Sequence, residues 1–398
     1  MFGWEYPPRH LGGLGVACQG LVRGLLGHGV KVTLVLPCAS DTTDDVDILS
    51  PQETLLEHIR IKSTLQPYDS HTSFSLRAST TPHHGMHPMY GEGLEQAVEL
   101  FTASSVELTK HLEPDVVHAH DWMTYGAGIV SARHHNRPLV AHIHATELDR
   151  THFHPNEWIY ERERYGFLQA DRIIAVSQYT KNILTEHYGI AADKISVVHN
   201  GSDECMDATP TPLLTWSPVK KAPMVLFLGR LAIQKGPRHF LQMATMVHAH
   251  RPDVQFVIAG DGHMLPSLID EAIHLGLKDN VVFAGKVSRE EGRALYAQAD
   301  CFVMPSLSEP FGLVALEAIA QGTPVILSKQ SGASEVVRHG FHVDFWDTEK
   351  MADCVLTILR EQPLALQLTS EAPSILQKLT WSNQAGHVRS IYEDLLRS

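Results

Sequence analysis

The sequence predicts an α/β protein built from two parallel-sheet domains. Short apolar runs alternate with stretches of helical periodicity in both halves of the chain, and this alternation is typical of a parallel sheet whose strands are joined by helices. The halves share this rhythm but no sequence period, so they are not tandem repeats. A length of 398 residues suits two domains of about 150 to 200 residues each. We therefore expect two Rossmann-like domains.

The composition indicates a globular, acidic protein. The chain is 43% hydrophobic, no run approaches the roughly 18 to 20 apolar residues of a membrane span, and no basic region followed by an apolar one begins at Met1. We therefore expect a cytoplasmic protein without a membrane span. A net charge of −13 disfavours nucleic acid as a partner, so any phosphate site must be locally basic. The five scattered cysteines form no CxxC pair, which indicates reduced thiols.

The first domain is expected to cover residues 1–208. It opens with the tail of a strand at residues 1–4, where a complete first strand would normally stand, so we expect a truncated start. The turn Gly12-Gly13-x-Gly15 leads into a helix, and its glycines let the backbone approach a ligand closely. An ordinary strand-to-helix turn is the alternative, because the spacing is not that of a dinucleotide-binding GxGxxG.

Strands and helices then alternate around a long polar insertion at residues 41–93, a kind of segment that is usually functional or mobile. The expected strands are 31–37, 115–119, 138–143, 172–177 and 194–199, and the expected helices are 94–112, 125–134, 147–170 and 179–188.

Two histidine clusters mark the carboxyl ends of predicted strands, where ligands bind in such sheets. They read HAHD at residues 118–121 and HIHATE at residues 142–147. A His-x-His pair at a strand end projects two imidazoles to one side, so a metal site is one interpretation of these clusters.

The second domain is expected at residues 209–380, beginning with a linker at 209–221 that contains three prolines and no periodicity. Its expected strands are 224–229, 254–260, 281–285, 301–304 and 325–327, and its expected helices are 239–250, 265–275, 290–298 and 312–321. Arg230 and Lys235 leave the first strand within one loop, where two cations can clamp a diphosphate. A solvated pair of side chains is the alternative.

Two helix starts are expected to face one crevice in this domain, one at Gly312 and one in the turn Ser331-Gly332-Ala333-Ser334. Helix N-termini suit a diphosphate, because they present unpaired amides and a partial positive charge. Glu309 and Glu317 enter the same crevice, and carboxylates accept hydrogen bonds from hydroxyl groups. A ligand that is anionic at one end and rich in hydroxyls at the other, such as a nucleotide sugar, fits both features. A surface helix that happens to carry two acids is the alternative.

The segment PSLSEPFGLVALEA, with its two glutamates in E-x7-E spacing, resembles the signature of retaining GT-B glycosyltransferases, family 4 in particular. GRLAIQKGP resembles the GRL-x-x-QKG motif of that family, and VHAHDWMTYGAG resembles a segment of the glycogen and starch synthases. The resemblance covers nearly the whole chain. It implies two Rossmann-like domains with the active site between them, and a C-terminal helix at residues 381–398 that crosses back to the first domain.

The resemblance also implies a role for individual residues. It places Glu309 near the donor sugar, Glu317 on the donor ribose, His144 beside the reacting carbon, and Arg230 with Lys235 on the departing diphosphate. The remaining donor-binding residues that it implies are Gly12, Gly13, Asp121, Asn200 of the NG-x-D turn, Phe311, Gly312, Leu313 and Gly332. One departure from the synthase pattern is His10, which stands where the synthases have a lysine.

The reaction that the resemblance implies is the transfer of glucose or a related hexose, with retention, from UDP- or ADP-glucose to an α-glucan or another glycan. We expect no cofactor and no metal in this reaction, since no DxD motif lies near the site. Two alternatives remain at this point: a metallohydrolase built on the histidine clusters, and a nucleotide-sugar-binding module without catalysis. We make no prediction of the oligomeric state.

Overall fold

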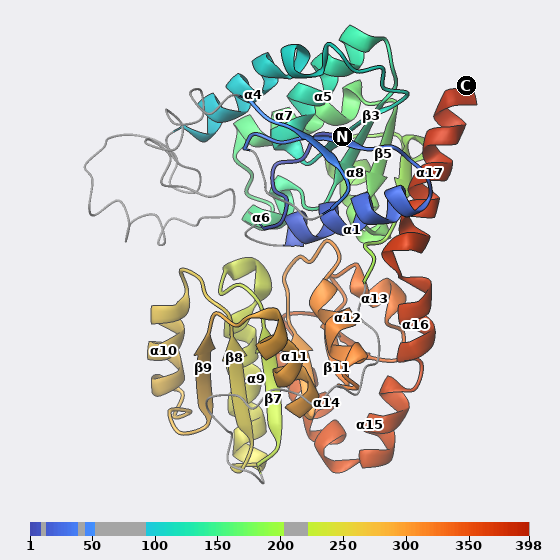
Figure 1. Ribbon diagram of the computed structural model, residues 1–398. Helices are drawn as coiled ribbons and strands as arrows, with labels where there is room; N and C mark the ends of the chain where they lie inside the picture. The colour runs from blue at the N-terminus through green and yellow to red at the C-terminus, as the bar shows by residue number, and fades with distance from the viewer. Residues whose placement is uncertain (9–12, 39–43, 52–92, 203–221, 398) are drawn as a thin grey trace. The chain divides into compact units, whose positions relative to one another are not determined.

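The computed structural model describes residues 1–8, 13–38, 44–51, 93–202 and 222–397. The chain forms two compact units: unit 1 is Met1–Asp203 together with Leu379–Ser398, and unit 2 is Glu204–Lys378 (Figure 1). For comparison, the sequence placed the boundaries at residues 208 and 380. The expected linker at 209–221 and most of the polar insertion lie outside the described residues. None of the helices in the described ranges is long and apolar enough to cross a membrane.

Unit 1 is built on a four-stranded parallel sheet in the order β3-β4-β5-β6. Its strands are β3 Val117–His120, β4 Leu139–Ile143, β5 Arg172–Ala175 and β6 Ile195–Val197. A second parallel pair consists of β1 Thr33–Val35 and β2 Asp47–Leu49. Phe2 bridges the two groups of strands, because it pairs with Val35 on one side and Ala119 on the other. The segment that we expected to be the tail of a strand therefore lies between β1 and β3.

The helices of unit 1 cover both faces of this sheet (Figure 1). They are α1 Gly13–Gly27, α4 Leu94–Thr109, α5 Trp122–His135, α6 Glu147–Thr151, α7 Glu157–Gln169, α8 Gln178–His187 and α17 Trp381–Arg397. Helix α17 packs on α1 across glycine positions. A β-carbon at Gly20 would lie 2.2 Å from the indole of Trp381, so only a glycine lets the two helices approach this closely.

One helix expected from the sequence is broken in the structure. The range 147–170 forms two helices, α6 and α7, because His152 and Phe153 adopt left-handed backbone angles with φ of 53° and 62°. The side chain of Asn156 then accepts a hydrogen bond from the Trp158 amide and begins the second helix. The continuous helical periodicity did not show this interruption.

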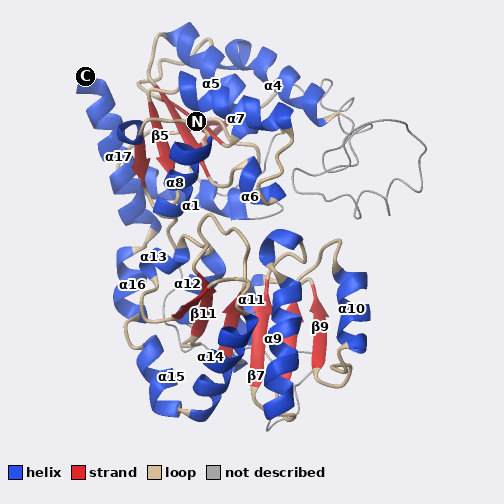
Figure 2. Ribbon diagram, turned by 180° about the vertical axis from the view of Figure 1, so that it is seen from behind, coloured by secondary structure: helices blue, strands red, loops and turns tan. Residues whose placement is uncertain are grey.

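Unit 2 contains a six-stranded parallel sheet in the order β12-β11-β10-β7-β8-β9 (Figure 2). The strands are β7 Met224–Leu228, β8 Gln255–Ala259, β9 Val281–Gly285, β10 Cys301–Met304, β11 Val325–Ser328 and β12 Phe341–Val343. Counted from β7, this is the 3-2-1-4-5-6 order of the doubly wound fold, in which the strand order reverses between the first and fourth strands. The reversal therefore lies between β7 and β10.

Helices cover both faces of the unit 2 sheet, as a fully buried parallel sheet requires. They are α9 Pro237–His250, α10 Leu265–His274, α11 Arg289–Gln298, α12 Leu313–Ala320, α13 Ala333–Val336, α14 Thr348–Arg360, α15 Gln362–Thr369 and α16 Ala372–Lys378.

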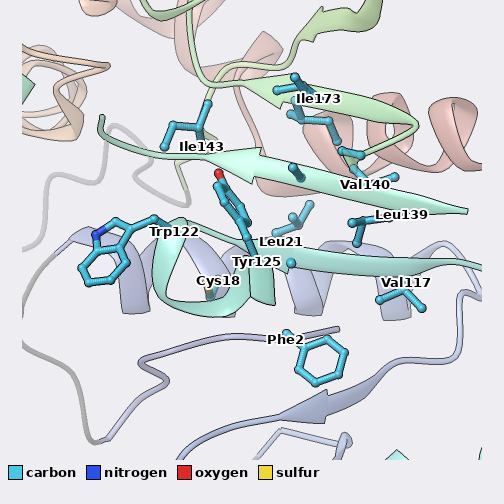
Figure 3. Close-up of a cluster of buried hydrophobic side chains, with 14 of the residues drawn as sticks. Phe2, Cys18, Leu21, Val117, Trp122, Tyr125, Leu139, Val140, Ile143 and Ile173 are labelled. Atoms are coloured by element: carbon cyan, nitrogen blue, oxygen red, sulfur yellow. The ribbon is translucent and has the colours of Figure 1, made fainter. Parts of the chain in front are cut away.

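Each unit has its own hydrophobic core. In unit 1, side chains from the strands meet side chains from α1 and α5, as Figure 3 shows for Leu21, Tyr125 and Val140. The Tyr125 ring reaches from α5 to β4, where its hydroxyl donates a hydrogen bond of 3.2 Å to the carbonyl of His142. These cores fix the strand ends that carry the polar residues described next.

Candidate active site

The loops that follow β7 and β10 carry the charged residues of unit 2. Both loops leave the carboxyl ends of adjacent strands at the point where the strand order reverses. Crevices at such points are the usual ligand sites of open α/β sheets. The topology therefore brings Arg230 and Lys235, which follow β7, to the same edge as Glu309, which follows β10.

Glu309 is held by the next loop along the sheet. Its amide donates to the carbonyl of Gln330 at 2.9 Å, and its carbonyl accepts from the amide of Gly332 at 2.9 Å. The amide of Ala333 donates to the carbonyl of Phe311 at 2.6 Å. The loops after β10 and β11 are thus joined by backbone hydrogen bonds, which leave the Glu309 side chain 8% exposed.

The bonds of Gly332 and Ala333 correct one expectation. We expected two helix N-termini with unpaired amides, but the first amides around α13 are already used within unit 2. The helix is also only four residues long. Helix α12 remains as the helix N-terminus of this edge, and the donor-binding role of Gly332 stays a prediction.

Helix α12 begins directly after a glycine with a left-handed backbone. Gly312 has φ of 101°, and a β-carbon there would lie 3.1 Å from Cγ of Glu309. A side chain at this position would be strained and would press on the carboxylate. The turn therefore sets Leu313, the first residue of α12, immediately after the loop that carries Glu309.

Lys235 and Glu309 form an ion pair. The Lys235 ammonium lies 2.5 Å from Oε2 of Glu309, and the Ser306 hydroxyl donates to the same oxygen at 3.3 Å. The loops can approach this closely because Gly236, with φ of 69°, has no side chain to meet the carbonyl of Pro305, which would lie 2.0 Å from a β-carbon. The lysine side chain is 27% exposed, so a ligand can reach the cation of the pair.

Two further charged residues belong to the elements of this pair. Arg230 precedes Lys235 in the loop after β7, and Glu317, which follows Glu309, lies in α12. Arg230 follows β7 and is half-buried. Burial and then the charge of Arg230 lower the pKa of His263, a half-buried histidine in the loop after β8. Glu317 lies in the second turn of α12, where it accepts a hydrogen bond of 3.3 Å from the Tyr296 hydroxyl. The edge thus presents two cations and two carboxylates from the ends of two strands, β7 and β10, and from the helix α12.

In unit 1, Asp121 and His144 follow the adjacent strands β3 and β4. Asp121 has no exposed surface, and its Oδ1 accepts the His144 amide at 2.7 Å. Its other carboxylate oxygen lies 3.5 Å from the guanidinium of Arg150. The resemblance implies that Asp121 contacts the donor sugar, and this stays a prediction; in the structure its carboxylate also holds the His144 loop. Asp121 therefore positions the His144 loop, whatever its contact with the donor.

His144 is half-buried at the end of its strand. Its Nε2 lies 3.0 Å from Nδ1 of His120, and its ring stacks on that of His142 at 4.3 Å. Burial lowers the pKa of His144, so the imidazole is neutral near pH 7. The hydrogen bond gives His120 a part in orienting His144, which sequence reasoning did not assign to it.

The remaining predicted residues of unit 1 lie at its loops. Asn200 is 9% exposed, and its neighbour Ser202 donates through its amide to the carbonyl of Leu379 at 2.6 Å, just before α17. Gly13 is the first residue of α1, and a side chain there would meet no atom of the described residues within 4 Å. Gly12 lies outside the described residues, as do His10 and the aspartate of the NG-x-D turn.

Comparisons with known proteins place this arrangement in a family. Residues 11–204 match the model for "Glycosyltransferase Family 4", and residues 216–374 match that for "Glycosyl transferases group 1". The glycogen synthase of Mycobacterium tuberculosis is 30% identical over 407 residues, which cover 98% of this chain and 93% of the relative. This chain belongs to glycosyltransferase family 4. An uncharacterized glycosyltransferase of Methanocaldococcus jannaschii is 28% identical. The match covers 99% of this chain and 97% of that relative.

Solved structures confirm the GT-B fold expected for a family 4 glycosyltransferase. Sucrose-phosphate synthase from Thermosynechococcus elongatus has a TM-score of 0.75 at 20% identity, covering 99% of this chain and 96% of its own. HepE of Anabaena, in complex with UDP and glucose, has a TM-score of 0.68 at 20% identity. The match covers 99% of this chain and 100% of the HepE chain. These structures show the GT-B fold. The family match and the glycogen synthase relative make the chain a hexosyltransferase, so the metallohydrolase and non-catalytic alternatives are set aside.

Some residues of this glycosyltransferase site were missed in the sequence. Gln234 joins the two loops of the ion pair, because its side chain donates to the carbonyl of Ser308 at 3.0 Å and its carbonyl accepts the Leu307 amide at 2.8 Å. Its place in the QKG of the quoted motif was a signal that could have found it. His263 and Tyr296 gave no such signal, since each becomes relevant only through the packing of neighbouring loops.

Proposed function

We propose that this glycosyltransferase transfers glucose or a related hexose from a nucleoside diphosphate sugar to an α-glucan or another glycan, with retention of the α configuration. The observation that carries the proposal is the Lys235–Glu309 pair at the strand reversal of unit 2, with Arg230 on the same loop as the lysine. The name of the M. tuberculosis relative, glycogen synthase, supports a glucan acceptor. The HepE complexes with UDP and with UDP-glucose support a UDP-linked donor, and ADP-glucose is the second candidate.

Arg230 and Lys235 bind the diphosphate in this proposal. Charge accumulates on the leaving diphosphate as the bond to the sugar breaks, and fixed cations stabilise that charge without needing to reorganise. The amides at the start of α12, at Leu313, add a partial positive charge at the same edge. A chain with a net charge of −13 thereby gains a locally basic site.

Glu309 acts nearest to the sugar. Its carboxylate stabilises the positive charge that develops on the sugar ring in an oxocarbenium-like transition state. When the donor binds, its diphosphate competes for the Lys235 ammonium, which Glu309 holds in place in the free enzyme. The pair therefore keeps the cation positioned before the donor arrives.

Glu317 binds the ribose of the donor through its hydroxyl groups. Phe311, Gly312 and Leu313 form the turn between the two glutamates, so they fix the separation of the sugar-binding and ribose-binding carboxylates. Phe311 is 2% exposed, which makes its side chain part of the support for the loop.

In this proposal, residues of unit 1 bind the acceptor and contact the transferred sugar. We propose that the neutral imidazole of His144 hydrogen-bonds the transferred sugar near the reacting carbon, and that Asp121 and His120 hold it there. Asn200 also lies near the donor sugar, and Gly12 and Gly13 let the backbone approach the diphosphate.

A panel of nucleotide sugars tests the proposal. The enzyme is incubated with each donor, with and without glycogen or maltooligosaccharides, and released nucleotide is measured. UDP- or ADP-glucose should release nucleotide faster with the glucan, and NMR of the product should show an α linkage. A β-linked product would overturn the retaining mechanism, and release from no hexose donor would overturn the proposed donor class.

A further inference from the structure

One face of the unit 1 sheet carries a cluster of buried histidines. In the proposed reaction only His144, at the edge of this cluster, contacts the sugar. His118 and His120 are alternate residues of β3, so their side chains lie on the same face. His142 lies on β4 directly beside His120 in the register. Helix α17 covers this face, since the Tyr392 hydroxyl lies 2.5 Å from Nδ1 of His118. We name these three side chains the histidine triad.

The triad is buried and poorly satisfied. The three side chains are at most 3% exposed, and their ring centroids lie 4.5 to 5.3 Å apart. Nε2 of His118, Nε2 of His120 and both ring nitrogens of His142 have no hydrogen-bond partner in the described protein. Buried polar atoms nearly always have a partner, so four such nitrogens in one place require an explanation.

The hydrogen bonds that the triad rings do make are of the kind that metal-binding histidines make. A histidine that binds a metal through one ring nitrogen usually holds its other nitrogen in a hydrogen bond. His118 has Tyr392 on Nδ1, and His120 has His144 on Nδ1, at 3.0 Å, which leaves Nε2 of each ring for a ligand. One candidate ligand atom from each triad residue lies within 4.8 Å of the other two.

We propose that His118, His120 and His142 bind one transition-metal ion of the Zn²⁺ class. Imidazole nitrogens are good ligands for such ions, and three of them around one ion is a known arrangement. This inference does not depend on the proposed transfer reaction.

Coordination requires the rings to turn from the stacked arrangement of the structure. The three rings lie within 14° to 29° of parallel, whereas ligands of one ion must aim their lone pairs at a common point. The His142 ring has no hydrogen bond to hold it, so it can rotate about its side-chain bonds while the paired strands stay fixed.

Cys18 offers a competing arrangement. Its sulfur lies within 4.8 Å of ligand atoms of His120 and His144. The two arrangements share His120, and the triad supplies three imidazoles to one ion where the Cys18 arrangement supplies two. The triad is therefore the better site.

The test locates the ion and counts it. Protein produced in zinc-supplemented medium should retain one zinc per chain after dialysis, because the site is buried. Crystals measured at the zinc edge should show one anomalous peak about 2.0–2.1 Å from a ring nitrogen of each triad residue. The zinc-loaded protein should also unfold at a higher temperature than stripped protein, since binding to the folded state alone stabilises it.

A variant and a matched control complete the test. His142→Gln should lose the zinc, whereas His111→Gln, which changes an exposed histidine of the same unit, should keep it. Zinc at the wild-type level in folded His142→Gln, or no anomalous peak at the triad, would overturn the proposal. A peak at Cys18 and His144 would overturn the ligand assignment. If His142→Gln does not fold, the anomalous map of the unmodified protein decides alone.

Discussion

Replacing Lys235 by methionine tests two roles of the Lys235–Glu309 pair: its contribution to the stability of the fold and its contribution to turnover of the donor. The ammonium lies 2.5 Å from a carboxylate that is only 8% exposed, and the other donor to that oxygen is the Ser306 hydroxyl at 3.3 Å. Removing the lysine leaves a largely buried charge with one long hydrogen bond. The expected loss of stability is about 1.5–3 kcal/mol, the scale of a hydrogen bond to a charged group. This exceeds the roughly 0–1 kcal/mol that an exposed loop lysine would contribute.

The same change should lower kcat/KM for the nucleotide sugar by about 100-fold or more, the scale of losing one preorganised electrostatic contact. Glu309→Gln should lower kcat and kcat/KM together by a similar factor, because its carboxylate acts on the transition state. Steady-state release of nucleotide measures the rates, and denaturant unfolding measures the free energies. The double variant should lose less than the sum of the two single losses, because the residues act as a pair.

Lys329→Met is the matched control. Lys329 also belongs to unit 2 and pairs with Asp344 at 2.8 Å, but its side chain is 54% exposed. We expect about 0–1 kcal/mol of destabilisation and unchanged kinetics. The reasoning fails if Lys235→Met behaves like Lys329→Met in both measurements, since the pair would then be an ordinary surface contact.

Further predictions test other parts of the molecule. Glu317→Ala should mainly raise the donor KM, because the ribose does not change during reaction; a fall in kcat alone would reverse the assignment. Transfer should persist in excess chelator at temperatures where the fold is intact, and activity restored by one added metal would contradict this. Gly20→Val should destabilise the protein by about 1–3 kcal/mol through its clash with Trp381, which denaturant unfolding measures. Arg230→Met should raise the pKa of His263 toward 6.5 in an NMR titration, since the positive charge that opposes protonation is removed. An unchanged titration would place Arg230 elsewhere.

Local patterns were sufficient to predict the fold, because parallel strands buried on both faces leave clear apolar runs. Residues 301–304 and 281–285 were predicted with the bounds of β10 and β9. The break at His152 and Phe153 was missed, since most residues other than glycine rarely take a left-handed backbone; Pro155, just after the break, was a signal that could have found it.

The sequence predicted which residues follow the strand ends, but not the contacts between them. Lys235 and Glu309 are 74 residues apart, and they meet because β10 pairs with β7, a neighbour relation that no local pattern encodes. The burial of Asp121 and the use of the Gly332 amide likewise depend on tertiary packing. Motif resemblance named these residues correctly as members of the loops, but packing decides which of their atoms a ligand can reach.

The position of α17 determines the order in which the protein can be completed during synthesis. Unit 1 is discontinuous: its last helix packs on α1 through Trp381 and reaches the sheet through Tyr392, yet these residues leave the ribosome after the whole of unit 2. Unit 2 is one continuous segment and can fold as soon as it emerges. The first part of unit 1 must therefore wait, with the surface of α1 at Gly20 and the histidine face uncovered, until α17 has emerged. A ribosome that stalls before codon 381 would release a chain with a complete second unit and an open first one, which makes the unfinished product a target for chaperones and proteases.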